Sequence, residues 1–287
     1  MRQLLATVLL LLPLAFSRAD DIRVVDWNME WFPGGKPNAP QAAQDKQMKA
    51  AQDALIALKP DILICQEVHD WAAVEKLVSV IPGLKVDVVS NFAERPQNQA
   101  IASRFPMDSG WSEDWKKTTS DGPPRGYVFA ALNLPNGCTL LTYALHLKSN
   151  RDGVAPNIPV REESARQLLS HLDAMIKLYR ARGPVAVLVG GDFNTSPDPE
   201  FASEKTISII KAAGLDWTFD GVPLDQRVSH PGSGQYADAN FDHIFTGGLG
   251  LHTATVKPVA NVSDHHPVIL DFKLSDSSPF ALKLPPN

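Results

Sequence analysis

Acidic, amide and imidazole side chains stand at the ends of apolar, strand-like runs at six places in this sequence of 287 residues. The six segments are Trp27-Asn28-Met29-Glu30, Gln66-Glu67, His146-Leu147-Lys148, Gly191-Asp192-Phe193-Asn194, Asp242-His243 and Asp264-His265. Because side chains alternate along a strand, residues two apart share a face, which pairs Asn28 with Glu30 and Asp192 with Asn194. One polar residue at a strand end is usually a turn or a helix cap, whereas six such segments indicate a polar site.

These are the residue types that hydrolysis of a phosphoester needs. Hard divalent cations such as Mg²⁺ bind through one or two carboxylates together with waters and substrate oxygens, so Glu67 and a second acid suffice. Amides such as Asn28 and Asn194 donate to phosphate oxygens or orient a water without adding negative charge. A His–Asp pair supplies proton transfer or electrostatic stabilisation near neutral pH. The sequence has two cysteines and no zinc-ligand spacing, which disfavours a zinc hydrolase.

The elements that must position these residues follow from the apolar pattern. It predicts strands over 22–27, 62–65, 85–89, 99–105, 127–134, 138–146, 185–189, 241–246, 251–256 and 267–272, and helices over 42–58, 71–80, 162–182 and 206–213. Asn136-Gly137 is a strong hairpin signal between two of the strands. Residues 107–126 are predicted to form a polar loop. Its Trp111 and Trp115 either stack on a substrate or, as is commoner for loop aromatics, pack against the domain. Hairpins mixed with βα units predict one α/β domain with its site at the rim of its sheets.

The motifs, in this order, resemble those of the endonuclease/exonuclease/phosphatase superfamily, which includes deoxyribonucleases, apurinic/apyrimidinic endonucleases, neutral sphingomyelinases and inositol-polyphosphate phosphatases. The segments that carry the resemblance, from Asn28 to Pro267, are WNMEWF, CQE, NQAIASRFP, RGYVFAAL, LHLKS, GGDFNTSP, FDHIF and SDHHP. The resemblance implies a four-layer α/β sandwich, in which two packed mixed β-sheets are flanked by helices and the site lies at the rim between the sheets.

The resemblance also implies which residues bind the metal and the phosphate. Glu67 matches the main metal-binding carboxylate of the family, with Asn28 beside it, and Asp264 resembles the second acid near the metal. The metal is expected to be Mg²⁺, with Mn²⁺ or Ca²⁺ as alternatives. Lys148 and Arg125 are assigned to the substrate phosphate; the alternatives are a solvated lysine and a structural arginine.

The catalytic roles come from the same match. Asp192 would orient or activate the attacking water, and Asn194 would hold the scissile phosphate. His265 resembles the essential histidine that faces this phosphate, and Asp242 the carboxylate that pairs with it. His146 would assist the leaving oxygen.

One departure from the deoxyribonuclease type concerns the support of that last histidine. The strand matching Gln97–Arg104 has no carboxylate at the place where one supports the histidine in these enzymes, and Glu94 stands just before it. We therefore expect His146 to be a poorly supported acid and Lys148 to carry more of the phosphate neutralisation. Five other histidines are predicted to be surface or packing residues: His69, His171, His230, His243 and His252.

The N-terminal residues predict export. Arg2, the apolar run Leu4–Phe16 and the small residues of Ser17-Arg18-Ala19 are typical of a signal peptide cleaved after Ala19. The run is too short to span a membrane. We expect residues 1–19 to be a signal peptide, residues 20–287 to form a single domain, and the protein to be secreted or periplasmic.

Composition limits the partners. Hydrophobic residues make up 44% and charged residues 21%, as in ordinary globular proteins. Of the 27 Lys and Arg, 25 remain after residues 1–19, against 32 acidic residues, so the mature net charge is −7. This charge excludes a stoichiometric nucleic-acid coat protein, but not an enzyme that contacts nucleic acid transiently. Cys65 and Cys138 either form one disulfide or stay as two buried thiols.

The expected function is an exported, monomeric, Mg²⁺-dependent phosphodiesterase, most simply a deoxyribonuclease-like endonuclease. The alternatives are a sphingomyelinase-like or small-molecule phosphodiesterase or phosphatase, and a non-catalytic binding protein on the same fold. Sphingomyelinases that act on membranes present an apolar hairpin, whereas the hairpin here turns at the polar Pro135-Asn136-Gly137. This turn disfavours membrane insertion and leaves soluble phosphate substrates open.

Overall fold

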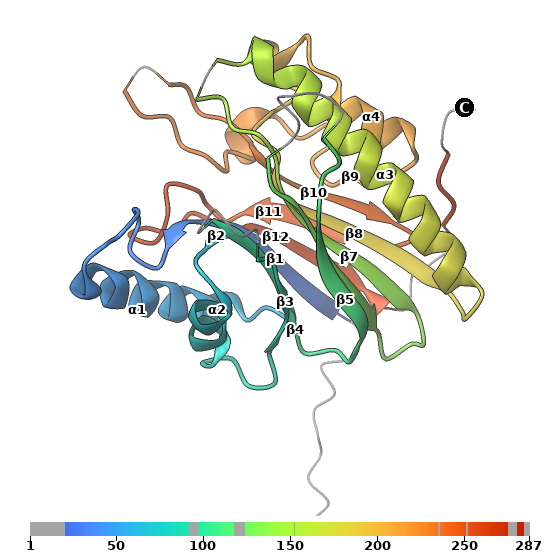
Figure 1. The fold of residues 1–287 in the computed structure, drawn as a ribbon, viewed down its shortest axis with the longest axis horizontal. Coiled ribbons are helices and arrows are strands. Elements are labelled where there is room, and N and C mark those ends of the chain that lie inside the picture. The colour runs from blue at the N-terminus through green and yellow to red at the C-terminus, as the bar shows by residue number, and fades with distance from the viewer. Residues whose placement is uncertain are drawn as a thin grey trace, which may run out of the picture.

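The described residues of the computed structural model form two six-stranded sheets with helices on their outer faces (Figure 1). The structure describes residues 21–91, 97–117, 124–151, 153–234, 236–250, 252–274 and 280–283, so the predicted signal peptide and Glu94 lie outside it. The strand orders are β11-β12-β1-β2-β4-β3 and β5-β6-β7-β8-β10-β9. Each sheet contains a parallel pair, β1 with β2 and β7 with β8, among antiparallel ones. The predicted four-layer sandwich of two mixed sheets is confirmed.

The strands and helices have the following bounds. The first sheet contains β1 (Asp21–Phe32), β2 (Ile62–Val68), β3 (Lys85–Val89), β4 (Asn98–Ser103), β11 (His252–Val256) and β12 (Val268–Lys273). The second contains β5 (Met107–Asp114), β6 (Gly126–Asn133), β7 (Thr139–His146), β8 (Val185–Asp192), β9 (Asp216–Trp217) and β10 (Asp242–Gly247). The helices are α1 (Gln41–Leu58), α2 (Trp71–Val78), α3 (Ile158–Arg180) and α4 (Thr206–Ala212).

Strand β1 shows how sequence alternation builds the layers. Val25 and Trp27 face outward and belong to the core under α1 and α2, whereas Val24 belongs to the core between the two sheets. By the same period of two, Asp26 and Asn28 continue the inward face toward the end of the strand, and both are buried. The rim between the sheets therefore starts where the inward residues of β1 change from apolar to polar.

Helix α3 covers the second sheet because its apolar residues form one stripe. Leu168, Leu172, Ile176 and Tyr179 recur at intervals of three or four residues, and all four are buried. The helix begins at Ile158, four residues before the predicted start, with Pro159 in its first turn, where a missing N–H costs nothing. None of the helices in the described part of the chain is long and apolar enough to cross a membrane.

The prediction of a loop over 107–126 is wrong for its first half. Residues 107–114 form β5, which pairs with β6 at the edge of the second sheet. An edge strand needs few apolar residues, so its sequence reads like a loop. Trp111 and Trp115 pack as predicted: the ring centroids are 4.5 Å apart for Trp111 and Phe129, and 5.0 Å for Trp115 and Tyr127.

Two further sequence predictions are settled by the fold. Strand β1 does not end at Trp27 but continues through the polar residues to Phe32. Cys65 and Cys138 are both free and buried, which is the two-thiol alternative.

Candidate active site

Three neighbouring strands of the second sheet place polar residues side by side at one edge. β7 and β8 end at His146 and Asp192, and the antiparallel β10 begins at Asp242. The register sets His146 beside Asp192 and Asp192 beside Asp242. All three side chains are almost completely buried. The predicted residues His146, Asp192 and Asp242 are therefore brought together by the pairing of the strands.

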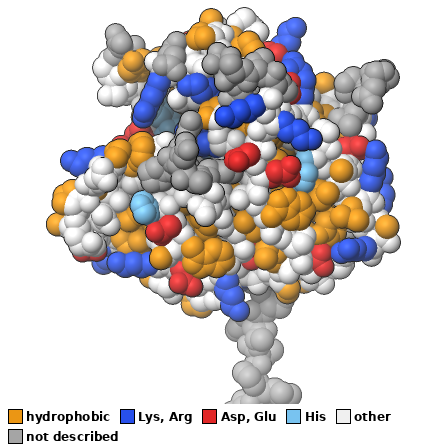
Figure 2. All heavy atoms as spheres, in the orientation of Figure 1, with side chains coloured by type: hydrophobic (Ala, Val, Ile, Leu, Met, Phe, Trp, Pro, Cys, Tyr) orange, Lys and Arg blue, Asp and Glu red, His pale blue; other side chains and the backbone are white. Residues whose placement is uncertain are grey.

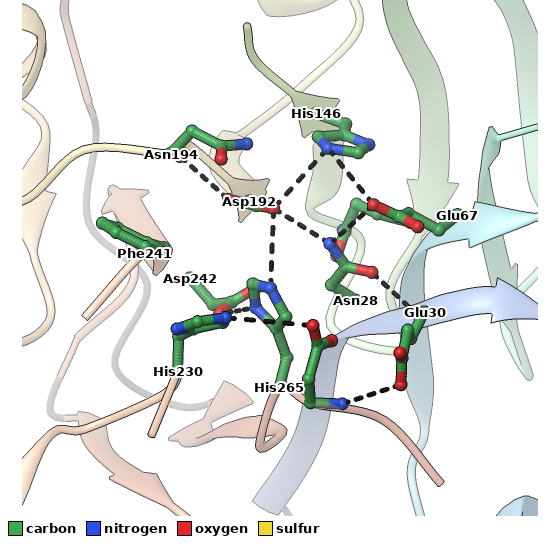
Figure 3. Close-up of polar contacts among 12 residues, drawn as sticks. Asn28, Glu30, Glu67, His146, Asp192, Asn194, His230, Phe241, Asp242 and His265 are labelled. Atoms are coloured by element: carbon green, nitrogen blue, oxygen red, sulfur yellow. Dashed lines mark hydrogen bonds and ion pairs between the residues drawn. The ribbon is translucent and has the colours of Figure 1, made fainter. Parts of the chain in front are cut away.

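The first sheet adds Asn28, which reaches across to the second. Its Nδ2 donates a hydrogen bond of 2.9 Å to Oδ2 of Asp192 (Figure 3). Its Oδ1 accepts the backbone N–H of Glu30 at 3.1 Å. Asn28 therefore fixes the Asp192 carboxylate, and its binding of a metal through Oδ1 stays a prediction.

Glu67 faces the site because the end of β2 is irregular. In regular alternation Glu67 would share the outward face of Cys65, but it has a left-handed φ of 60° and the pairing with β4 shifts between Cys65 and Val68. Its Oε2 accepts the backbone N–H of Trp31 at 3.1 Å. Its Oε1 lies 3.8 Å from Nε2 of His146.

Positive φ angles of non-glycine residues gather around this site. They occur at Glu30, Trp31, Glu67, Arg125 and Asn194, with values between 48° and 65°. A conformation of this kind costs of order 1–3 kcal/mol per residue and persists where the surroundings impose it. The surroundings of the site therefore hold several strand-end residues in a strained backbone conformation.

His265 and Asp242 form a buried ion pair. Nδ1 of His265 lies 2.7 Å from Oδ2 of Asp242, whose backbone N–H donates to Ser229 Oγ. Burial alone would lower the pKa of His265, but the charge and hydrogen bond of Asp242 raise it to about 10. His265 is therefore a cation at neutral pH, and its Nε2 lies 4.0 Å from Oδ2 of Asp192.

Asp192 lies at the centre of the polar cluster. In addition to Asn28, its Oδ1 accepts the backbone N–H of Asn194 at 2.8 Å, and its Oδ2 lies 3.5 Å from Nε2 of His146. Burial raises the pKa of Asp192 to about 7, although the charge of His265 lowers it. A carboxylate with such a pKa is poised to accept a proton near neutral pH.

His146 is enclosed and neutral. Burial, and then the charges of Arg125 and His265, lower its pKa well below the ordinary value. Its Nδ1 is buried and has no hydrogen-bond partner in the described part of the chain. This agrees with the absence of a supporting carboxylate, and the assistance of His146 to a leaving oxygen stays a prediction.

Glu30 was not predicted as a site residue, although it shares a strand face with Asn28. Its Oε2 accepts the backbone N–H of Asp264 at 3.1 Å. Burial, and then the charge of Asp264, raise the pKa of Glu30 to about 7, and the charge of Glu67 acts in the same direction. Glu30, Glu67 and Asp264 therefore form an acidic group beside Asp192, in which the Asp264 side chain is 54% exposed.

His230 is also in the site, whereas the sequence suggested a surface or packing residue. Its ring centroid is 4.7 Å from that of His265, and its Nε2 lies 3.9 Å from Oδ2 of Asp264. Its ring also packs against Phe241, with centroids 5.5 Å apart. No local signal marks it, because the segment that carries it is irregular and rich in turn residues. His243, by contrast, is a packing residue as predicted and contacts Trp217 Nε1.

The residues assigned to the phosphate lie around this cluster. Asn194 Nδ2 donates to the Leu147 carbonyl oxygen at 3.3 Å. Arg125 Nη1 donates at 3.2 Å to the carbonyl oxygens of His146 and Leu147, so it holds the end of β7. Lys148 is half-buried just beyond that end. Contact of these side chains with phosphate stays a prediction.

The donor set suits a hard divalent cation by its residue types. The combinations Asp192–Asp242–His265 and His230–Asp264–His265 bring ligand atoms within 4.8 Å of one another. Both include His265, which is a cation paired with Asp242. The carboxylates of Glu30, Glu67 and Asp264 offer the oxygen ligands that Mg²⁺ prefers and gather negative charge that a cation would neutralise.

Comparison with known proteins gives matches to a family and to several structures. The model of the Endonuclease/Exonuclease/phosphatase family matches residues 27–265. A UPF0294 protein of Vibrio campbellii (strain ATCC BAA-1116) is 28% identical over 153 residues, which cover 53% of this chain and 46% of that protein. The chain thus spans about half the length of such curated relatives.

Two solved structures share the fold. The crystal structure of truncated Caenorhabditis elegans TDP2 has a TM-score of 0.61 and 20% identity, and the match covers 88% of this chain and 98% of that chain. The human Nocturnin catalytic domain with bound sulfate anion has a TM-score of 0.63 and 18% identity, covering 88% and 93%. Identities this low are evidence for the fold alone.

Proposed function

The chain belongs to the endonuclease/exonuclease/phosphatase family, whose enzymes are divalent-metal-dependent phosphoesterases, and from this premise we propose that it is a Mg²⁺-dependent phosphodiesterase that cleaves nucleic acid, most simply a deoxyribonuclease-like endonuclease. The observation that carries the proposal is that a proton acceptor and a positive charge lie close together in a buried site. A carboxylate able to accept a proton, Asp192, lies 4.0 Å from a cationic imidazole, that of His265.

Asp192 activates the attacking water in this proposal. Asn28 and the Asn194 backbone hold the two carboxylate oxygens in fixed directions. The pKa of Asp192, raised to about 7, makes the carboxylate basic enough to take a proton from water as it attacks. Because Asp192 is preorganised by hydrogen bonds, no reorganisation is needed at the moment of reaction.

His265 stabilises the negative charge that develops on the phosphate. Asp242 keeps the imidazole protonated and oriented, since it binds Nδ1 and leaves Nε2 directed toward the site. A fixed positive charge in a buried site stabilises a developing negative charge far more than it would in water. His265 therefore acts as a cation that Asp242 holds in place.

The acidic group of Glu30, Glu67 and Asp264 would hold Mg²⁺. When bound, the ion polarises a phosphoryl oxygen and neutralises charge on the substrate. The Trp31 backbone N–H fixes one oxygen of Glu67, which keeps this carboxylate at the rim beside Asp192. Mn²⁺ or Ca²⁺ would use the same oxygen ligands.

One feature disfavours a membrane lipid, and a second is compatible with transient contact with nucleic acid. The connection between β6 and β7 carries the exposed residues Pro135, Asn136 and Gly137, which offer no apolar hairpin for insertion. Acidic and basic side chains are interspersed on the face seen in Figure 2, with no extended patch of one sign. Such a surface suits transient contact with a polyanion rather than tight non-specific binding.

Export is part of the same proposal. Cleavage after Ala19 would leave β1 whole, because this strand begins at Asp21. Mass spectrometry of the protein from the culture medium or periplasm of a bacterial host should give the mass of a chain that begins at Asp20. An intact N-terminus in the cytoplasm would contradict export.

Hydrolysis assays on the purified mature chain test the activity. Supercoiled plasmid, single-stranded DNA, RNA, sphingomyelin vesicles and bis-p-nitrophenyl phosphate are compared with Mg²⁺ and with EDTA. We expect cleavage of DNA with Mg²⁺, little with EDTA and little by His265→Ala. Equal activity of wild type and His265→Ala on every substrate would overturn the catalytic assignment, and faster cleavage of sphingomyelin than of DNA would overturn the substrate class.

A further inference from the structure

A cavity of about 500 Å³ lies between the end of β1 and the helices α1 and α2. Trp31, Pro33, Pro37 and Met48 contribute apolar walls. The volume lies within the range of about 300–1,000 Å³ typical of small-ligand sites. None of the roles assigned to the catalytic residues uses this cavity.

Trp31 connects the cavity to the site. Its backbone N–H donates to Glu67 Oε2 at 3.1 Å, while the residue itself lines the cavity. Its φ of 48° is strained for a bulky side chain, and such strain is kept where the surroundings require it. Trp31 therefore belongs both to the wall of the cavity and to the support of Glu67.

The chemistry of the walls selects the ligand. An indole and two prolines offer flat apolar surfaces to a planar ring. Asn38 and Gln44 add amide groups, which hydrogen-bond well to the edges of bases. Gln44 Nε2 already donates to the Ala39 carbonyl oxygen at 2.8 Å, which leaves its Oε1 and the exposed Asn38 amide for a polar ligand.

The charged residues at the rim are Lys36 and Lys76 together with Asp45 and Asp70, so their formal charges balance. Lys36 lines the cavity, is exposed and makes no ion pair with any described residue. Lys76 also lines it and lies 3.7 Å from Asp45 through its ammonium group. A nucleotide combines a planar ring with a neighbouring phosphate, so its ring matches the walls and its phosphate matches the ammonium group of Lys36.

We propose that this cavity is a nucleobase subsite, in which a base next to the scissile phosphate stacks on Trp31. The inference rests on the proposed function, since it assigns the substrate of that site to nucleotides. It gives Trp31 two separate contributions: the backbone N–H orients Glu67, and the side chain binds the substrate. A substitution that keeps the backbone should therefore affect binding of the base alone.

Equilibrium binding in EDTA tests the subsite without any cleavage. The probes are a short fluorescein-labelled oligodeoxyadenylate and an abasic deoxyribose-phosphate chain of the same length and charge. We expect wild type to bind the base-bearing probe more tightly. Trp31→Ala should lower its affinity by about tenfold, within the range measured for stacking on aromatic residues, and leave the abasic probe unchanged. Trp31→Phe should retain most of the preference.

Trp71→Ala is the matched control. Trp71 is 47% exposed at the start of α2 and is not among the described residues that line the cavity. This variant should bind both probes like wild type. A wild type without a preference for bases, or a preference that survives in Trp31→Ala, would overturn the subsite.

Cleavage of DNA with Mg²⁺ is a separate readout. A protein that prefers the base-bearing probe but cleaves no phosphodiester would disprove the proposed activity and leave the subsite standing. A protein that cleaves DNA but binds both probes equally would disprove the subsite and leave the proposed activity standing.

Discussion

Asp242→Asn removes the charge that keeps His265 protonated while preserving the size of the side chain. In the wild type the pKa of His265 is about 10, against an ordinary value of 6.5. A difference of this size corresponds to roughly 5 kcal/mol at about 1.36 kcal/mol per pH unit. Without the Asp242 charge, burial opposes protonation, and we expect the pKa of His265 to fall to about 6.5 or below.

The loss of activity should therefore depend on pH. At about pH 8 an imidazole with a pKa of 6.5 is only about 3% protonated, so the activity of the variant should fall at least about 30-fold. At about pH 6 a larger fraction of the imidazole is protonated than at pH 8, so the ratio of variant to wild-type activity should rise as the pH falls. This rise separates lost charge from damaged structure.

The assay is kcat/KM on DNA between about pH 6 and pH 9, with the His265 imidazole followed by NMR titration. Asp271→Asn is the control, because Asp271 pairs with Arg23 in a partly exposed ion pair of β1 and β12 and should change neither quantity. A His265 that still titrates above about pH 9 in Asp242→Asn, or a loss of activity that is equal at all pH values, would refute the reasoning.

Three more outcomes are expected. Glu67→Gln should reduce Mg²⁺-dependent hydrolysis by roughly a hundredfold and raise the Mg²⁺ concentration needed for half-activity, as measured by metal titration. Arg161→Ala should lower the free energy of unfolding by about 3–5 kcal/mol in urea melts, because it leaves the fully buried Glu204 partner of the 2.5 Å ion pair without its counter-charge. The stabilisation from the His265–Asp242 pair should be complete below pH 6.5 and lost as pH rises through about 10, since the pKa of His265 is higher in the folded than in the unfolded state. Melts near pH 6, 8 and 10 check this. A contribution of the pair that grows with pH would contradict it.

The sequence predicts the architecture well because the apolar runs match buried strands and helix faces. The row His146, Asp192, Asp242 could also be anticipated, since each residue stands at the end of such a run. What fails is the edge strand β5, where one face is open to solvent and the apolar pattern disappears. Local pattern thus suffices where both faces of an element are buried.

The candidate site is only partly contained in the sequence. The position of Glu67 depends on a left-handed φ that residue preferences do not predict. Glu30 also has a positive φ at an irregular strand end, and this places it in the acidic group. His230 reaches His265 from an irregular segment whose path depends on tertiary contacts. Arg161, one of several scattered arginines in the sequence, is fully buried because Glu204 lies far along the chain but beside it in the fold.

The hydrogen bond from Asn28 to Asp192 joins residues of different sheets, so the halves of the site are carried by separate layers of the sandwich. A slide of one sheet against the other would separate Glu67 from Asp192 while each sheet stayed intact. Ligands that bridge the two layers, such as a metal ion with its phosphate, would clamp them together and resist that slide. The proposed catalysis therefore requires that the two sheets stay docked in one relative position.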